Sequence, residues 1–515
     1  MKNFRELINA SYTFKGSSIT LGTAMLDGSP LDQTLVKVPL KTLNRHGLIA
    51  GATGTGKTKS LQVLAEGLSE QGIPVLLMDI KGDLSGLAAP GEPHPKIDER
   101  MKHIGIPFEP TGFPIESLTI SDEKGVRLRA TVSEFGPVLL GKILDLNDTQ
   151  SGIISLIFKY CDDHQLPLLD LKDLKKILQY VTNEGKEAVE GEYGRISSAS
   201  VGTITRKIIE LEQQGAELFF GERSFDPADL LRADKDGRGM INVLRLVDIQ
   251  DRPKLFSTFM LCLLAEIYAT FPEQGDSDKP RLVMFIDEAH LLFKEASEAL
   301  LDQLDSIIKL IRSKGVGIYF CTQVPDDIPQ NILSQLGLRI QHALRAFTAR
   351  DRKKIKLAAE NFPPSEFYEI DELLTSLGIG EALVTVLNEK GIPTPLAATL
   401  MTAPRSRMGI LSDEELSAII DKSELVEEYN EQIDRRSAYE LLNEKIEVAA
   451  SKGEETAPTR KKTPGDAKEE SLIEQLSRNT MVRQMGRTLV REISRGLLGA
   501  LGAKPRRTRR SSSLW

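Results

Sequence analysis

Short runs of consecutive apolar residues recur along the chain, separated by longer stretches with helical spacing. The runs are GLIAG at 47–51, PVLLMDI at 74–80, MINVLRL at 240–246, RLVMFID at 281–287 and VGIYFCTQ at 316–323. Continuous apolar runs of this length predict strands buried on both faces, as in a parallel sheet. A helical pattern, KTKSLQVLAEGLSEQG, joins the first two runs. We therefore predict an α/β fold that contains a parallel βαβ unit with a right-handed crossover.

Other patterns flank or interrupt this core. Residues 1–40 alternate apolar and polar positions between turn residues, which predicts a short β segment. Residues 91–236 carry apolar residues at i, i+3, i+4 and i+7, which predicts an all-helical insertion. The insertion separates a first part of the core at 41–90 from a second part at 237–410. Within the second part, residues 380–401 predict a hairpin that turns at Glu389-Lys390-Gly391.

The C-terminal region is polar and charged. We expect a charged helix at 411–450, a flexible linker at 451–470, and a basic amphipathic helix with a tail at 471–515. Residues 471–515 hold ten Lys/Arg and two Glu, a net charge of +8. Because the whole chain carries −8, the remainder carries −16. Any nucleic-acid contact is therefore expected to be local.

Composition narrows the class of protein. The chain has 515 residues, of which 40% are hydrophobic and 27% charged, as expected for a globular protein with more than one domain. No run approaches the ~20 apolar residues that span a bilayer, so we expect no integral membrane segment. The N-terminal residues lack a secretory pattern, and the three cysteines are scattered. These features predict a cytoplasmic protein without a structural zinc site.

GATGTGKT fits the phosphate-binding pattern G-x-x-x-x-G-K-[ST] and lies between a predicted strand and a predicted helix. Glycines let successive backbone N–H groups face the phosphates of a nucleotide, assisted by the helix N-terminus. Lys57 supplies positive charge to the phosphate oxygens, and the hydroxyl of Thr58 ligates Mg²⁺. The predicted nucleotide-binding residues are Gly51, Ala52, Thr53, Gly54, Thr55, Gly56, Lys57 and Thr58. The alternative is a glycine-rich structural turn, which the flanking predicted strand and helix disfavour.

Two acidic residues end the strand predicted at 281–287. Asp287 is placed to hold Mg²⁺, and Glu288 to polarise an attacking water. The alternative is that the pair caps the following helix. Together with the glycine-rich loop, both carboxylates favour hydrolysis of the nucleotide, ATP with Mg²⁺, over passive binding.

Two further candidates are polar or basic residues after strands. Gln323 follows the strand at 316–323, where a neutral polar side chain contacts the γ-phosphate or the water; strand-end polarity is the alternative. Arg345 is our candidate for an arginine that acts on the γ-phosphate of a neighbouring subunit, ahead of Arg339. For any single arginine here, Arg350 included, a solvated basic face is the competing interpretation.

These motifs together resemble a known family. RHGLIAGATGTGKT, VLLMDIKGDL, RLVMFIDEAH, LIRSKGVGIYFCTQVPDDIP and the GEALV hairpin resemble the HerA/FtsK group of P-loop motor ATPases. More narrowly, they resemble bacterial HerA-helicase-like proteins, over most of residues 41–500. The resemblance implies a RecA-like core, assembly into a homo-oligomeric ring that is often hexameric, and ATP-driven movement on DNA. Within it, Gly51–Thr58 match the phosphate loop, Asp287 the magnesium aspartate, Glu288 the catalytic glutamate and Gln323 the sensor.

The basic C-terminal helix leaves the partner open. Its arginines recur every four residues beside an apolar stripe, at Arg483, Arg487, Arg491 and Arg495. Such a helix fits DNA phosphates, an anionic membrane surface or an acidic patch of the same molecule. Two functions follow: a DNA-associated ring motor or helicase-like translocase, or a nucleotide-dependent switch that recruits a protein partner without moving on DNA.

Overall fold

The structure is a computed structural model that describes residues 2–275, 277–294, 296–431, 433 and 435–454. It divides into two compact units. The first unit comprises 1–130 and 213–433, and the second comprises 131–212 and 434–515. None of the helices in the described ranges combines the length and apolar character needed to cross a lipid bilayer.

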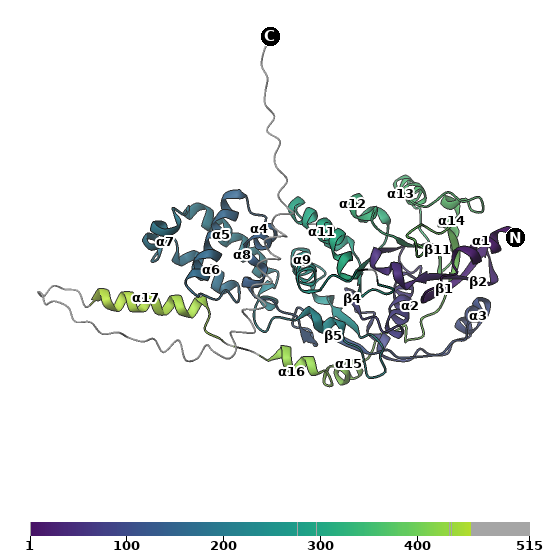
Figure 1. Cartoon of the computed structure of the whole chain (residues 1–515), viewed down its shortest axis with the longest axis horizontal. Coiled ribbons are helices and arrows are strands. Elements are labelled where there is room, and N and C mark those ends of the chain that lie inside the picture. The colour runs from purple at the N-terminus through teal and green to yellow at the C-terminus, as the bar shows by residue number, and fades with distance from the viewer. Residues whose placement is uncertain (1, 276, 295, 432, 434, 455–515) are drawn as a thin grey trace, which may run out of the picture. The chain divides into compact units, whose positions relative to one another are not determined.

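A mixed sheet organises the first unit (Figure 1). Its strand order in the described residues is β2-β1-β12-β11-β10-β3-β9-β8-β4-β7-β5-β6. The strands are β1 (Ser18–Leu26), β2 (Ser29–Pro39), β3 (Gly47–Ala50), β4 (Val75–Asp79), β5 (Ile115–Thr119), β6 (Val126–Arg127), β7 (Ile241–Arg245), β8 (Leu282–Ile286), β9 (Val316–Thr322), β10 (Leu338–His342), β11 (Glu381–Thr385) and β12 (Ala397–Met401). The strands from β10 to β6 in this order pair in parallel, and β11, β12, β1 and β2 add an antiparallel edge. The predicted α/β fold with a parallel sheet is confirmed.

The apolar runs become strands because helices cover both faces of the sheet. Val75 and Leu77 of β4 pack in the same cluster as Leu61, Leu64 and Leu68 of α2. The helices of this unit are α1 (Lys2–Ser11), α2 (Lys57–Glu70), α3 (Pro95–Ile104), α9 (Pro253–Thr270), α10 (His290–Phe293), α11 (Glu298–Ile311), α12 (Gln330–Leu333), α13 (Ala349–Glu360), α14 (Ile370–Ser376), α15 (Asp413–Ile420) and α16 (Glu424–Asn430). All five residues of β4 and all five residues of β8 are buried, as their sequence patterns predict. The predicted hairpin at 380–401 is confirmed as β11 and β12, which pair antiparallel.

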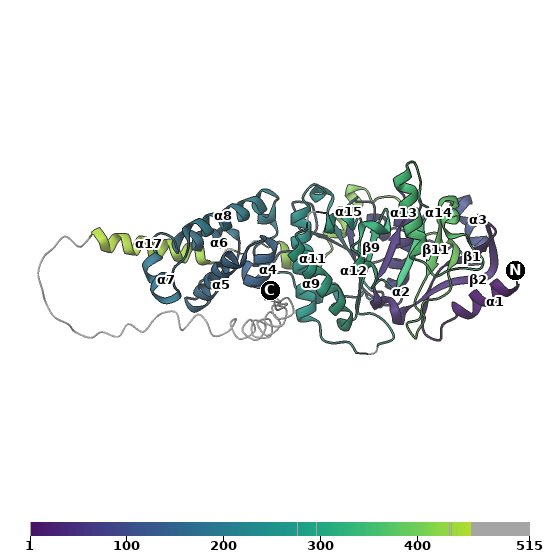
Figure 2. The same cartoon turned by 90° about the horizontal axis from the view of Figure 1, so that it is seen from above.

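The second unit is helical. Its helices are α4 (Val132–Ile143), α5 (Asp148–Asp163), α6 (Leu171–Tyr180), α7 (Lys186–Tyr193), α8 (Ser198–Gln213) and α17 (Ala438–Glu454). Buried residues at helical spacing, such as Ile154 and Ile157 of α5, form its core. α17 packs along α6 (Figure 2), and Asp173 of α6 accepts the backbone N–H of Tyr439 at 2.8 Å. The C-terminal segment thus returns to complete a unit that begins more than two hundred positions earlier.

Three predicted boundaries are wrong. The range 91–236 is not helical throughout, because β5 and β6 lie within it and β5 pairs with β7. Strand β5 contains the charged residue Glu116, which interrupts the apolar run that would predict a buried strand. In the structure Glu116 is buried, and its Oε2 contacts Nη2 of Arg232 at 2.5 Å. The range 1–40 contains helix α1 before its two strands, held by the buried side chains of Phe4, Ile8 and Tyr12 at four-residue spacing.

The third concerns the charged helix predicted at 411–450. The chain forms three helices there, α15, α16 and α17, and the first two belong to a different unit from the third. Ser412 caps α15 in a capping box with Glu415, which fixes a helix start at that point. The basic amphipathic helix and tail predicted at 471–515, and the linker from 455 onward, lie outside the described residues.

His46 joins the edge of β3 to two other elements of the core. It is 3% exposed, its Nε2 lies 2.8 Å from the carbonyl oxygen of Ile308, and the N–H of Ile318 donates to its Nδ1 at 3.0 Å. This pair of contacts needs the neutral tautomer that carries its proton on Nε2. Burial lowers the pKa of His46 to about 4.

We expect this neutral histidine to make stability depend on pH. Because the pKa is lowered in the folded state, the unfolded chain binds the proton first, and stability is lost as pH falls from about 6.5 toward 4. The loss between pH 7 and pH 5 should be smaller by about 2 kcal/mol in His46→Gln than in the wild type. Urea unfolding at the two pH values measures it, and equal losses in the two proteins would contradict a neutral His46.

Candidate active site

The glycine-rich loop links β3 to α2 in a conformation that only its glycines accommodate. Gly51, Gly54 and Gly56 have φ of 153°, 76° and 117°. A Cβ on Gly51 would lie 2.5 Å from the Cβ of His342, so the loop also packs too closely for a side chain there. α2 begins at Lys57, immediately after the last of these glycines. The backbone therefore curls against the N-terminus of a helix, which is the geometry that receives phosphate groups.

Neighbouring strands hold the loop in place. The N–H of Gly51 donates to the carbonyl oxygen of Thr322 in β9 at 3.2 Å. The N–H of Ala52 donates to the carbonyl oxygen of Ala343, just after β10, at 2.8 Å. The carbonyl of Thr55 accepts the N–H of Gly380 at 2.9 Å. These bonds fix the loop before any ligand arrives, so little ordering would be required of it on binding.

The side chain of Lys57, the first residue of α2, folds back over the loop. It is 7% exposed, and its Nζ donates to the carbonyl oxygen of Ala52 at 3.1 Å. Burial, with a smaller contribution from the charge of Lys81, lowers its pKa. Thr58 is half-buried in the first turn of the same helix. A lysine held this way by one carbonyl is available to phosphate oxygens, which would be far stronger acceptors.

Asp287 and Glu288 follow β8, two strands from β3 in the sheet. Asp287 is 4% exposed, its Oδ2 has no hydrogen-bond partner among the described residues, and burial raises its pKa to about 6. Glu288 is 7% exposed and has a left-handed backbone with φ of 44°. A non-glycine residue in that conformation costs about 1–3 kcal/mol and is typically retained at functional sites.

The turn after β4 adds a third charged element to this edge. The buried carboxylate of Asp79 accepts the backbone N–H groups of Gly82, Asp83 and Leu84 at 2.7–3.1 Å. The Nζ of Lys81 forms an ion pair with Oε1 of Glu288. Burial opposes the charge of Lys81, but the contact with Glu288 raises its pKa overall.

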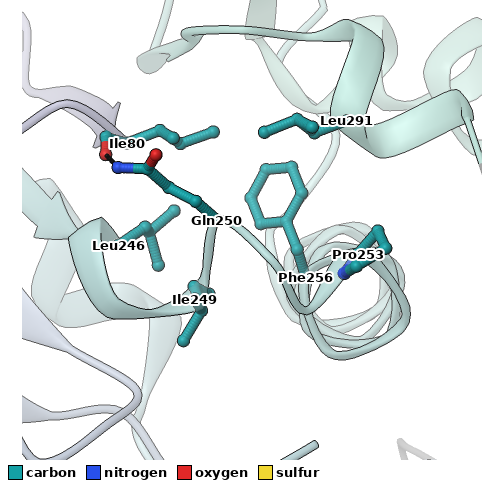
Figure 3. Close-up of a pocket in the computed structure, with 7 residues that line it drawn as sticks. All are labelled: Ile80, Leu246, Ile249, Gln250, Pro253, Phe256 and Leu291. Carbon is teal, nitrogen blue, oxygen red and sulfur yellow. Dashed lines mark hydrogen bonds between the residues drawn. The ribbon is translucent and has the colours of Figure 1, made fainter.

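A small apolar hollow lies beside this turn (Figure 3). Its lining includes Ile80, which precedes Lys81 in the sequence, and Leu291, which comes three residues after Glu288. Phe256 of α9 also lines it. Gln250 closes it by donating to the carbonyl oxygen of Ile80 at 2.6 Å. The hollow is lined by hydrocarbon and suits packing, whereas the loop at 51–58 supplies the groups that bind phosphate.

The other two candidates, Gln323 and Arg345, are exposed and follow strands on opposite sides of β3. Gln323 is exposed at the end of β9, the strand between β3 and β8. Arg345 is exposed after β10, on the other side of β3, where it donates to the carbonyl oxygen of Thr375 at 3.1 Å. Arg339 is a structural residue, because its guanidinium donates to the carbonyls of Asn361 and Leu333. Arg350 lies exposed in α13.

His342 is a residue that sequence reasoning missed. It is fully buried at the end of β10, with Nε2 2.9 Å from Oγ of Ser60 in α2 and Nδ1 2.9 Å from the carbonyl oxygen of Glu381. Burial lowers its pKa to about 4. Its Cβ packs against Gly51 and its ring faces Gly56, so His342 supports the loop at two of its glycines. The sequence gives no signal for this role beyond a single histidine at the end of an apolar strand.

The site suits Mg²⁺ held mainly by a nucleotide. No group of three or more His, Cys, Asp or Glu side chains is arranged to hold a metal in the part of the chain that the structure describes. Mg²⁺ normally uses one or two protein ligands, phosphate oxygens and water. The orphaned Oδ2 of Asp287 and the hydroxyl of Thr58 fit that pattern.

Comparisons with known proteins agree with this arrangement. The chain is 24% identical over 406 residues to the DNA double-strand break repair helicase HerA of Sulfolobus acidocaldarius, covering 75% of this chain and 70% of the relative. It is 25% identical over 371 residues to the HerA of Saccharolobus solfataricus, covering 68% of this chain and 63% of that relative.

A solved structure shares the fold. The plasmid coupling protein TrwB, in complex with the non-hydrolysable ATP analogue ADPNP, matches with a TM-score of 0.50 and 15% identity, over 79% of this chain and 95% of TrwB. The model of the family "Helicase HerA-like C-terminal" matches residues 25–507, and this chain belongs to that family.

Proposed function

We propose that this protein binds ATP with Mg²⁺ and hydrolyses it, and that it is a DNA-associated motor that works as a ring. One observation carries the ATPase part. The glycine-rich loop with Lys57 follows strand β3, and the acids Asp287 and Glu288 follow strand β8. The carboxyl ends of both strands lie on the same edge of the parallel sheet. Membership of the helicase HerA-like family supports the assignment of an ATPase.

The loop would hold the triphosphate. The backbone N–H groups of Gly54, Gly56, Lys57 and Thr58 would donate to the phosphate oxygens, whereas those of Gly51 and Ala52 stay bonded to the neighbouring strands; Nζ of Lys57 would exchange the carbonyl oxygen of Ala52 for a phosphate oxygen. Mg²⁺, when bound, offsets the charge of the phosphates, and Thr58 and Asp287 would hold it. The positive charges then lie where negative charge gathers during the reaction.

Glu288 would act on the water. As the water oxygen bonds to the γ-phosphorus, Glu288 accepts the water's proton, the bond from the γ-phosphorus to the β,γ-bridging oxygen breaks, and ADP leaves with the electron pair. Gln323, between the loop and the acids, would contact the γ-phosphate or the water and so sense which nucleotide is bound. Arg345 would act on the γ-phosphate of a neighbouring subunit of a ring.

The DNA part of the proposal rests on the relatives and on charge. The two HerA relatives are named as DNA repair helicases. Residues 471–515, with a net charge of +8, would supply sequence-independent contacts to phosphates. The remainder of the chain is acidic, so this segment would carry most of the affinity.

ATP hydrolysis measured with and without DNA tests the proposal. We expect DNA to raise the rate of the wild type, and to raise it less when Arg483, Arg487, Arg491 and Arg495 are all replaced by alanine. DNA binding of that variant should also depend less steeply on salt, because fewer phosphates are neutralised.

Hydrolysis that no form of DNA stimulates would contradict the motor and leave the second candidate, a nucleotide-dependent switch. The switch predicts slow turnover and capture of a protein partner in only one nucleotide state. Immobilised protein loaded with ADPNP or with ADP distinguishes the two states. Equal capture in both would contradict the switch.

A further inference from the structure

The ion pair between Lys81 and Glu288 joins two residues that the sequence separates by more than two hundred positions. They meet because β4 and β8 are neighbours in the sheet, with Met78 opposite Ile286. Each side chain then projects from the turn that follows its strand. The contact therefore depends on the topology of the core and does not arise between two mobile surface side chains.

Both backbones are fixed at this contact. Asp79 holds the turn that carries Lys81 through three backbone hydrogen bonds, and Gly82 in that turn has φ of 76°. On the other side, the N–H of Ala289 donates to Cys321 of β9 at 2.9 Å, which ties the turn after Glu288 to the next strand. The side chain of Lys81 is 41% exposed and that of Glu288 is 9% exposed. A lysine anchored at its base thus reaches a nearly enclosed carboxylate.

The two oxygens of Glu288 differ. Oε1 contacts the ammonium of Lys81. Oε2 is buried and has no hydrogen-bond partner among the described residues; Nδ1 of His290 lies 3.3 Å away but is not placed to form a hydrogen bond. A buried carboxylate oxygen without a donor is costly, and such atoms are usually satisfied by water or a ligand. Oε2 is therefore the oxygen available to a water molecule.

We propose that Lys81 is a positioning residue for hydrolysis: it anchors Oε1 of Glu288 and thereby directs Oε2 toward the attacking water. This inference rests on the proposed function, in which Glu288 accepts the proton. Lys81 acts through Glu288 and is not assigned a contact with the nucleotide. A carboxylate freed from this anchor would rotate about its side-chain bonds and lose its alignment with the water.

Steady-state hydrolysis of ATP by the full chain tests the inference with Lys81→Met, which keeps the hydrocarbon length and removes the charge. We expect kcat to fall about 10- to 100-fold with KM for ATP little changed, because ground-state binding is left intact. Lys81→Arg should restore most of kcat. Lys309→Met is the matched control: Lys309 pairs with Asp305 on an exposed helix face and should show wild-type kinetics.

A double-mutant cycle separates positioning from a direct role. If Lys81 acts through Glu288, then adding Lys81→Met to Glu288→Gln should cost less than about twofold more in single-turnover rate. Additive losses, or a rise in KM, would overturn the inference in favour of a direct contact with the nucleotide. A faster Lys81→Met enzyme would overturn it as well, because Lys81 would then restrain Glu288.

The proposed function and the inference fail in different ways. If the wild type hydrolyses no nucleotide, the proposed function is wrong. If the wild type is active and Glu288→Gln is inactive while Lys81→Met matches the wild type, only the inference is wrong. Thermal unfolding of each variant shows whether a loss of activity reflects a loss of fold.

Discussion

Glu288→Gln is expected to lower kcat for ATP hydrolysis at least about 100-fold, the range that general-base residues contribute. The amide has nearly the shape of the carboxylate but cannot accept a proton from water. Because the nucleotide is held by the loop at 51–58, ATP affinity should stay near that of the wild type. Single-turnover hydrolysis, together with equilibrium binding of a fluorescent ATP analogue, measures the two quantities separately.

Glu360→Gln is the control for this variant. Glu360 is exposed at the end of α13, away from the strand ends that carry the site, so its substitution should leave both quantities unchanged. If Glu288→Gln hydrolysed ATP at the wild-type rate, Glu288 would not be the group that receives the proton. In that case the neighbouring acids Asp79 and Asp83 would need testing.

Lys57→Ala is expected to weaken ATP binding about 10- to 150-fold, which corresponds to the loss of hydrogen bonds from a charged donor. Hydrolysis should fall further, because the same ammonium faces charge that develops on the γ-phosphoryl oxygens. Calorimetric titration with ADP and with ATP, in magnesium buffer, measures the loss of binding. The loss should be larger for ATP than for ADP if Lys57 contacts the γ-phosphate.

Lys309→Ala serves as its control, since it removes a half-exposed lysine of the same unit that lies on the outer face of α11. Lys57 is almost fully enclosed and bonds only to the loop in the described structure, so its removal also deletes the contact to Ala52. A variant that kept wild-type affinity for both nucleotides would contradict the assignment of the phosphate site to this loop.

Much of the core could be predicted because its signals are local. The five apolar runs became β3, β4, β7, β8 and β9, and the glycine-rich loop lies between β3 and α2 as its pattern requires. Strand β5 could not be recognised in this way, since the charge of Glu116 is neutralised by Arg232, a residue far away in the sequence. Helix α1 carried a readable signal in Phe4, Ile8 and Tyr12, but the strands beside it dominated the interpretation of that segment.

The site shows the same division between local and long-range information. Gly51–Thr58, Asp287 and Glu288 stand out by motif. Lys81 belongs to the motif MDIKGDL, but a turn with solvated charges explains that motif equally well; only the order β8-β4 places Lys81 at Glu288. The support that His342 gives to Gly51 likewise depends on β10 lying next to β3.

The strand order also has a consequence for synthesis of the chain. β3 lies between β9 and β10, and β4 lies between β7 and β8, so each early strand has both of its neighbours after residue 240 of the sequence. The first 130 residues therefore leave the ribosome without the neighbours of β3 and β4, the strands that precede Lys57 and Lys81, and residues 131–212 of the helical unit are made next. Unfinished chains accordingly have no nucleotide pocket, and they expose apolar strand edges that a chaperone would shield until β10 emerges.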